Sequence, residues 1–412
     1  MSLPMKSPSI RIFHEPYNRG PERIGNVKLW HIGVAAGTLL WLAAASAGAQ
    51  QTPADAIALE QQGKWADATQ AWKAVVAHNP KDAGALASLG VDLAKQQKYS
   101  EAASAYRKAL ALNPGLPGIE LNLGLAEFKQ GHFAAAIPPL QAAYGAEPAS
   151  TQIQTLLGMS YYGARKFALA SQTLAPLAKA QPENTELQQI LAQSCLWAKN
   201  YSCALELFRQ LVQRNPDSAE AHILTGEALD GLGRTQEAIP EFEAAAEISS
   251  QQPNVLFGLG YLYWKTQQYD RARQEFEKQL TLEPKNAQAL AYLGDIEWKD
   301  DHPEAALALL KRAAKIDPNL RIAQVDLGAI YLQQKNYGMA KAALLRAVTL
   351  APSLPDVHYQ LGRLYRALGD DAAATKELQQ AQELHQQLDE SLLGKMSPST
   401  AAEAPSNKEE KP

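Results

Sequence analysis

Residues 259–284 read LGYLYWKTQQYDRARQEFEKQLTLEP, and the spacing inside this stretch decides the fold. The pair Leu259-Gly260 lies in its first half. Ala272 and Phe276 lie four residues apart in its second half, and Pro284 ends it. Good helix formers fill both halves, and a short polar segment separates them. We therefore expect two helices joined by a turn, with the second helix stopped by the proline.

The closing proline recurs with a period of 34 residues, at Pro80, Pro114, Pro148, Pro182, Pro216, Pro284, Pro318 and Pro352. Ser250 occupies the one position in this series that lacks proline. If each unit ends two residues after its proline, ten units start at residues 49, 83, 117, 151, 185, 219, 253, 287, 321 and 355, with no insertion or deletion. A fixed period of this size indicates a solenoid, in which one supersecondary unit is copied end to end.

Three positions inside the unit explain how its helices meet. The eighth residue is glycine, except where Ala56 and Ala192 replace it. The twentieth residue is alanine in every unit, beginning with Ala68, and the twenty-fourth is aromatic or leucine, beginning with Trp72. Helices that cross at short distance need small side chains at the crossing, and a residue four positions further on faces the same way. We expect an all-α array in which the large residues fill the volume between hairpins.

This pattern resembles the tetratricopeptide repeat family, whose signature is W-x2-L-G-x2-Y, then A-x3-F, then P, at a period of 34. Leu259-Gly260, Tyr263, Ala272 and Phe276, with the proline that follows, match it almost completely. The resemblance covers residues 49–388 and implies an α-solenoid, a right-handed superhelix of about ten helical hairpins. It implies little about the ligand, because a fold does not determine a function.

Residues 1–49 resemble an export signal, with positive charges first, an apolar segment over 29–47 and small residues up to Ala49. One alternative is a signal peptide cut after Ala49, which we favour. The other is an uncleaved anchor in the inner membrane, because a segment of this length just spans a bilayer. Both place the array, residues 50–388, in the periplasm of a bacterium or on the periplasmic face of its inner membrane.

The last unit runs into a polar, glutamine-rich helix from Lys376 to about Leu393, which Gly394 is expected to end. A polar outer helix is what a terminal repeat needs, because nothing stacks on it. Residues 389–412 are therefore expected to hold the end of this capping helix and a disordered tail rich in Ser, Pro, Ala, Glu and Lys.

Composition and motifs point away from nucleic acid binding and from catalysis. The chain has 412 residues and a formal net charge of −4, and it contains no basic run that could follow a phosphate backbone. It contains no HExxH, GxSxG or GxxxxGK motif, and its eight histidines have no partner at metal-ligand spacing. We expect no catalytic residue, no cofactor and no metal site, and hence a protein that is not an enzyme.

The two cysteines fall on the two helices of one predicted hairpin. Cys195 lies late in the first helix and Cys203 early in the second, so an antiparallel hairpin brings them close. A disulfide is one alternative, because the array is expected outside the cytoplasm. Two small, buried, unpaired side chains are the other alternative, and we favour it because the sequence does not give the Cα separation.

In the family that this chain resembles, the first helices line the concave face, and the second, fifth, ninth, twelfth and thirteenth residues of each unit point inward. Here these positions carry aromatic residues that we expect to form a groove for a peptide or helix of a protein partner: Phe128, Tyr162, Trp197, Phe257, Tyr261, Trp264, Trp298 and Tyr359. The acids Glu220, Glu227, Asp230 and Asp295 lie among them. The alternative is that the aromatic residues pack across adjacent first helices, which suits the tyrosines better than the tryptophans.

No unit carries the inward asparagine and basic residues of the clamp with which some family members bind C-terminal carboxylates. The chain is expected to be a non-enzymatic scaffold for protein–protein interaction in the bacterial cell envelope. The alternative is an accessory or regulatory subunit of an envelope enzyme or export complex, in polysaccharide or protein secretion or beside a glycosyltransferase. The pattern indicates no particular partner and no oligomeric state.

Overall fold

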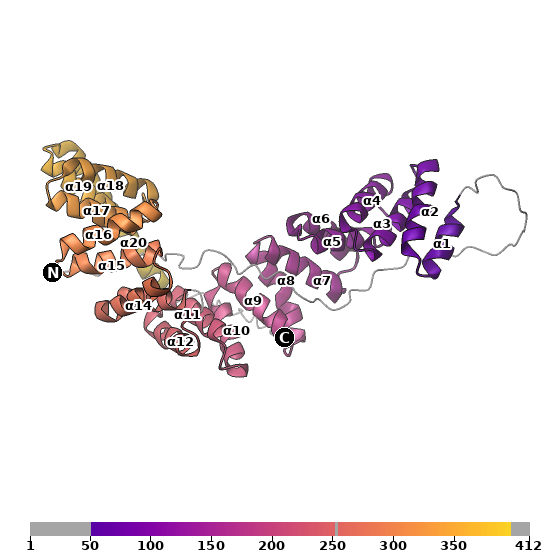
Figure 1. The fold of residues 1–412 in the computed structure, drawn as a ribbon, viewed down its shortest axis with the longest axis horizontal. Helices are drawn as coiled ribbons and strands as arrows, with labels where there is room; N and C mark the ends of the chain where they lie inside the picture. Colours follow the sequence, from indigo (N-terminus) through magenta and orange to yellow (C-terminus); the bar gives the residue numbers. More distant parts are fainter. Residues whose placement is uncertain (1–50, 252–253, 397–412) are drawn as a thin grey trace, which may run out of the picture. The chain divides into compact units, whose positions relative to one another are not determined.

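The computed structural model describes residues 51–251 and 254–396, and every regular element in these two stretches is an α-helix. The chain divides into an N-terminal unit, described from residue 51 to Glu241, and a C-terminal unit that begins at Phe242. The division falls inside helix α12 (Thr235–Ile248). In each unit, consecutive helices pair into hairpins that lie side by side in chain order (Figure 1).

The ten hairpins confirm the predicted all-α repeat array. Their first helices are α1 (Pro53–Gln61), α3 (Ala83–Lys95), α5 (Ile119–Lys129), α7 (Thr151–Gly163), α9 (Thr185–Trp197), α11 (Ala219–Gly231), α13 (Val255–Lys265), α15 (Ala287–Lys299), α17 (Arg321–Gln333) and α19 (Pro355–Ala367). Their second helices are α2 (Trp65–His78), α4 (Tyr99–Leu112), α6 (Phe133–Ala146), α8 (Phe167–Ala180), α10 (Tyr201–Arg214), α12, α14 (Tyr269–Leu282), α16 (Pro303–Ile316), α18 (Tyr337–Leu350) and α20 (Asp371–Met396).

Both ends of the chain fall outside the described residues. The predicted export segment, with its apolar stretch 29–47, lies there. The disordered tail is predicted to begin at Lys395, and its part from residue 397 onward lies there too. Among the helices that are described, none combines the length and the apolar character needed to cross a membrane. The capping helix α20 continues to Met396, two residues beyond the predicted stop at Gly394. A single glycine costs a helix only about 1 kcal/mol, so it need not end one.

Polar caps and prolines set the helix ends. Six first helices begin directly after a residue whose side chain accepts a hydrogen bond from a backbone N–H three residues later: Thr52, Asp82, Ser150, Asn184, Ser218 and Asn286. This bond satisfies one of the amide groups that a helix start leaves without a partner. At the other end, α2 stops at His78, two residues before Pro80, and seven more second helices stop two residues before a proline of the series. Helix α12 ends in the same register, at Ile248, although Ser250 replaces the proline there.

The two helices of a hairpin touch at the eighth residue. A Cβ atom added to Gly158 would lie 2.3 Å from Leu174 Cδ2, and one added to Gly260 would lie 2.8 Å from Phe276 Cε1. The large twenty-fourth residue therefore fills the crossing inside its own hairpin, in addition to the predicted volume between hairpins. The alanines at the twentieth position are buried in all ten units, with Ala68 0% exposed and Ala374 2% exposed.

We expect Gly158→Ala to lower the free energy of unfolding by about 1–3 kcal/mol, because the added methyl group overpacks the contact with Leu174. Gly145→Ala is the matched control, since a Cβ atom there would meet nothing within 4 Å. Alanine replaces a flexible glycine inside helix α6, so this control gains about 0.5–1 kcal/mol. Urea unfolding of both variants measures the difference, and equal effects would contradict the close crossing.

The turn inside each hairpin depends on one left-handed residue, the fifteenth of the unit. Four units have glycine there: Gly63, Gly131, Gly233 and Gly369, with φ between 71° and 77°. The other six have ordinary residues with φ between 58° and 62°: Gln97, Arg165, Lys199, Gln267, Asp301 and Lys335. A side chain costs energy in this conformation, so the helices on either side must hold it there.

We expect Gly131→Ala to destabilise the protein by about 1 kcal/mol, because alanine disfavours a positive φ. A Cβ atom at Gly131 meets nothing within 4 Å, so the effect reports the backbone alone. The reverse change in the next unit, Arg165→Gly, removes that strain but loosens the unfolded chain, so its net effect is smaller. Denaturant unfolding of the two variants gives both values, and an unchanged Gly131→Ala would refute the left-handed turn.

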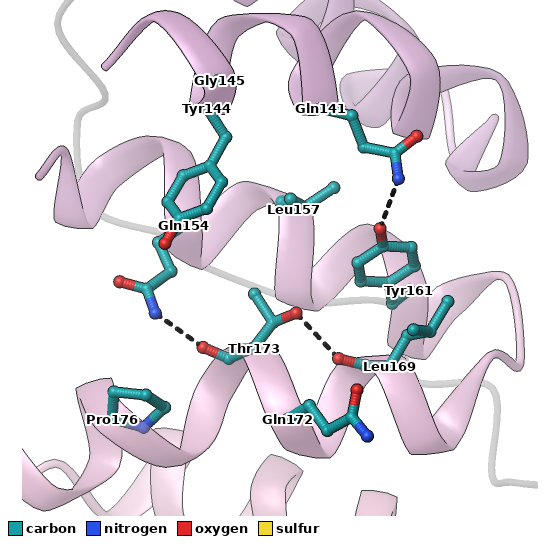
Figure 2. Close-up of a pocket in the computed structure, with 10 residues that line it drawn as sticks. All are labelled: Gln141, Tyr144, Gly145, Gln154, Leu157, Tyr161, Leu169, Gln172, Thr173 and Pro176. Carbon is teal, nitrogen blue, oxygen red and sulfur yellow. Dashed lines mark hydrogen bonds between the residues drawn. The ribbon is translucent and has the colours of Figure 1, made fainter. Parts of the chain in front are cut away.

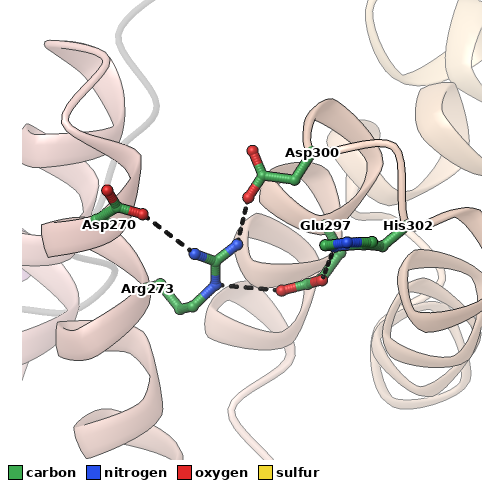
Figure 3. A network of polar contacts seen from close by, with 5 residues as sticks. All are labelled: Asp270, Arg273, Glu297, Asp300 and His302. Carbon is green, nitrogen blue, oxygen red and sulfur yellow. Dashed lines mark hydrogen bonds and ion pairs between the residues drawn. The ribbon is translucent and has the colours of Figure 1, made fainter.

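Ion pairs add contacts between hairpins. Arg273 of α14 donates from Nε to Glu297 Oε1 of α15 at 3.2 Å, and its NH2 group pairs with Asp300 at the end of that helix (Figure 3). Asp270 and His302 complete the network, with His302 Nδ1 lying 3.1 Å from Glu297 Oε2. The network joins the second helix of one repeat to the first helix of the next. Partly exposed pairs like these add modestly to stability.

Candidate partner-binding face

The first helices of successive repeats contact one another directly. In the N-terminal unit α5 contacts α3 and α7, and in the C-terminal unit α13, α15, α17 and α19 contact each other in sequence. In each unit we call the surface formed by these helices the first-helix face. It is where a partner can contact several repeats at once.

The structure sorts the eight aromatic residues of the predicted groove by exposure. Phe128, Phe257 and Tyr261 are only 5%, 1% and 1% exposed. Tyr162, Trp197, Trp264 and Trp298 are half-buried, and Tyr359 is 51% exposed. The first three pack in the core, because aromatic rings on neighbouring helices come close enough to cover one another. This corrects the expectation that all eight line an open face, and five remain within reach of a partner.

In the N-terminal unit, two of the predicted residues meet at one aromatic cluster. The ring of Trp197 lies 5.7 Å from that of Tyr162 and 4.9 Å from that of Phe167, centroid to centroid. The Tyr162 hydroxyl donates to Gln193 Oε1 at 2.6 Å. Burial raises the pKa of Tyr162, and the nearby Glu220 carboxylate adds to the shift. Phe128 is not part of this cluster and packs edge-on against Phe133, 5.4 Å away.

In the C-terminal unit, the aromatic residues gather around Tyr292 of α15. Its ring lies 5.9 Å from Phe257, 5.6 Å from Tyr261 and 4.9 Å from Trp264. Tyr292 is the sixth residue of its unit, a position that the sequence reasoning did not count as inward. The helical period could have indicated this position, because residues two, six, nine and thirteen of a unit lie on the same face of the first helix.

Acidic side chains lie on the first helices of both units, and Glu220 is close enough to Tyr162 to influence its pKa. Glu227 is half-buried on α11, and burial raises its pKa to about 8, with a further contribution from the neighbouring Asp230. Asp230 accepts a hydrogen bond from Thr235 Oγ1 at 2.6 Å. In the C-terminal unit, Asp295 is 4% exposed and accepts a hydrogen bond from Trp264 Nε1 at 2.5 Å. The first-helix face therefore combines aromatic rings with negative charge.

The raised pKa of Glu227 predicts a pH effect on stability. Folded Glu227 holds its proton more tightly than the unfolded chain, so its contribution is fully present below about pH 4.5 and is lost as pH rises toward 8. Glu227→Gln removes the titrating carboxyl group and therefore removes this loss of stability at higher pH. We expect the variant to gain stability over the native protein between pH 5 and pH 8 in urea unfolding. Glu186→Gln, at an exposed position on α9, is the control. If the unfolding free energy of Glu227→Gln followed pH in the same way as that of the control, the assignment would be contradicted.

The two cysteines form a disulfide, with Cα atoms 5.8 Å apart. This corrects the favoured expectation of two unpaired thiols. The reason is the geometry of the hairpin, which brings the end of α9 against the start of α10. Cys195 is 1% exposed. The disulfide lies within one repeat and joins its two helices.

A pocket of about 460 Å³ lies away from the predicted groove, between α6, α7 and α8 (Figure 2). Several of its polar side chains bond within the protein. Gln141 Nε2 donates to the Tyr161 hydroxyl at 2.9 Å, and Gln154 Nε2 donates to the backbone oxygen of Thr173 at 2.9 Å. None of the eight aromatic residues of the predicted groove lines this pocket, and we do not place the binding site there.

The described residues hold no group of three His, Cys, Asp or Glu side chains placed to bind a metal ion. Two histidines instead link repeats. His222 Nδ1 lies 2.7 Å from Glu241 Oε2, and its Nε2 lies 2.9 Å from the backbone oxygen of Pro216. His358 repeats this arrangement in the C-terminal unit, with Glu377 and Pro352.

The fold and the face define a helical-hairpin repeat protein. Models described as tetratricopeptide repeat match residues 54–117, 127–194, 198–253, 231–296, 263–330, 323–354 and 355–387. The chain belongs to the tetratricopeptide repeat family. The family fold indicates a scaffold for protein–protein interaction, and its members are generally not catalytic. A comparison with curated proteins gave no match.

Several solved structures are similar to this chain. The APC/C hetero-tetramer Cut9–Hcn1 shares 14% identity over 80% of both chains, with a TM-score of 0.48. YrrB, described as a TPR protein with an unusual peptide-binding site, shares 23% identity over 47% of this chain and all of its own, with a TM-score of 0.35. Yeast Tom70 shares 12% identity over 82% of this chain and 92% of its own, with a TM-score of 0.40. At these identities the likeness concerns the fold.

Proposed function

We propose that this protein is a non-enzymatic scaffold of the bacterial cell envelope, which binds a peptide or helix of a protein partner on its first-helix face. One observation carries the proposal: aromatic side chains on first helices that touch each other remain within reach of solvent. Trp264 and Trp298 are half-buried, and Tyr359 is 51% exposed. Aromatic anchors on a shared surface are typical binding hot spots.

The envelope location rests on the sequence of residues 1–49 alone. Positive charges precede the apolar segment 29–47, and small residues follow it, as in an export signal. The same segment serves as an inner-membrane anchor if it is not removed. In either case the array meets its partner on the periplasmic side.

The proposal is tested by pull-down from an envelope extract with the tagged full-length chain. The double variant Trp298→Ala/Tyr359→Ala removes two aromatic side chains from the first-helix face. The matched control, Leu282→Ala/Met339→Ala, removes two side chains that are each 50% exposed on second helices. Loss of aromatic anchors typically costs 1 kcal/mol or more per residue, so we expect recovery of the partner to fall about tenfold in the first variant only.

Circular dichroism establishes that both variants remain folded. Equal recovery by the native chain and the first-helix variant would refute the proposed face. Loss of the partner in the second-helix control alone would move the binding site to the other side of the hairpins. Recovery of one dominant envelope enzyme or export component would assign the scaffold to an accessory role in that complex.

A further inference from the structure

Five charged side chains lie together on the first-helix face of the C-terminal unit: Asp295, Lys299, Arg321, Asp326 and Asp356. They come from three consecutive first helices, α15, α17 and α19. We call them the α15–α19 charge cluster. It contains three carboxyl groups and two cations, so one carboxyl group has no cation as a partner inside the cluster.

Both cations of the cluster already have a carboxylate partner. Lys299 Nζ pairs with Asp295, which also accepts the hydrogen bond from Trp264. Arg321 NH1 lies 3.3 Å from Asp356 Oδ2. The carboxyl group left over is that of Asp326, on α17, the helix that also carries Arg321.

Asp326 is 8% exposed, and its Oδ2 atom has no hydrogen-bond partner. A buried polar atom in this condition costs about 1–3 kcal/mol, and native proteins leave few of them. Burial raises the pKa of Asp326 well above its ordinary value, and the Asp295 carboxylate adds to the shift. In the free protein Asp326 therefore favours its neutral form, with one buried oxygen still unpaired.

A second unsatisfied group faces the same place. The Tyr292 side chain is 2% exposed, and its hydroxyl also has no hydrogen-bond partner. Asp295, Asp326 and Arg321 all lie close enough to influence its ionisation. Two independent polar groups, on α15 and α17, are therefore both left without a hydrogen-bond partner beside the ion pairs of the cluster.

The side chains of the cluster indicate which chemical group could bind to the two unpaired atoms. The described residues have no group of three His, Cys, Asp or Glu side chains arranged to hold a metal ion, so we consider an organic cation. Lys299 Nζ lies 5.4 Å from the ring centroid of Trp264, so the aromatic residues here already accommodate a positive charge. A guanidinium or ammonium group could donate to the Asp326 carboxylate and to the Tyr292 hydroxyl oxygen together.

We propose that Asp326 and Tyr292 bind a positively charged side chain, arginine or lysine, of the protein partner. This inference deepens the proposed function and rests on it, because it names the chemistry that the first-helix face of α15, α17 and α19 recognises. It accounts for the retention of a buried carboxylate without an internal partner. Binding sites commonly carry such costs to stability.

The experiment selects random peptides displayed on phage against the tagged full-length chain, the Asp326→Asn variant and an Asp92→Asn control. Asp92 is 0% exposed in the N-terminal unit, and both of its carboxylate oxygens lack hydrogen-bond partners. Each variant removes one buried, unpaired carboxylate, so thermal unfolding should occur at a temperature about 2 °C or more higher in both. Only Asp326→Asn removes the proposed contact with the peptide.

We expect the native chain and Asp92→Asn to enrich peptides that contain arginine or lysine, and Asp326→Asn to lose this enrichment. Selected peptides, synthesised individually, should bind Asp326→Asn about tenfold more weakly than the native chain, because a buried charge pair is broken. Replacing their basic residue by citrulline or norleucine should weaken binding to the native chain by a similar factor. It should leave binding to Asp326→Asn nearly unchanged.

The outcomes separate this inference from the proposed function. If the native chain selects peptides without enriching basic residues, or if Asp326→Asn keeps the enrichment, the basic-residue site is refuted and the scaffold stands. If the native chain selects no peptide above background, the proposed peptide-binding face itself fails. If Asp326→Asn lowers thermal stability, the carboxylate has a structural partner and the inference is overturned.

Discussion

The close crossing of two helices inside each hairpin is the contact on which the rest of the structure depends. A glycine or alanine on the first helix lets a large residue of the second helix lie directly on its backbone, as Leu310 does on Gly294. Ala306 is buried completely one turn before Leu310, so neither helix can move away without opening a cavity. This contact recurs every 34 residues and gives hairpins of similar shape. Each hairpin stacks on the hairpins before and after it in the chain.

Because the crossing positions hold each hairpin together, the residues on the first-helix face are free to vary between units. The crossing positions carry small residues and a large apolar residue in every unit, whereas the face carries Tyr162 and Trp197 in one region and Trp264, Tyr292 and Asp326 in another. The rigid hairpins hold these side chains in place, so polar groups can remain unsatisfied there without collapsing onto other partners. Such positions lower stability locally, and under our proposal the binding of a partner would recover the loss.

Sequence periodicity predicted the ten hairpins, the buried alanines and the helix-ending prolines, because each follows from residue spacing along one chain. It did not reveal the left-handed turns, since residues such as Arg165 give no sign of a positive φ. It also missed Tyr292 and Asp326, because inward positions depend on how closely successive first helices approach. The pairing of Cys195 with Cys203 required the Cα separation of 5.8 Å, a tertiary distance that spacing alone does not supply.

A nuclear Overhauser measurement tests the central contact most directly. In full-length protein with labelled glycine and leucine methyl groups, the Hα protons of Gly294 should show strong cross-peaks to the methyl protons of Leu310. A Cβ atom at Gly294 would lie 2.7 Å from Leu310 Cγ, which leaves no room for another side chain between them. Absence of these cross-peaks in folded protein would show that the helices do not cross as described, and the account of the array would fail with them.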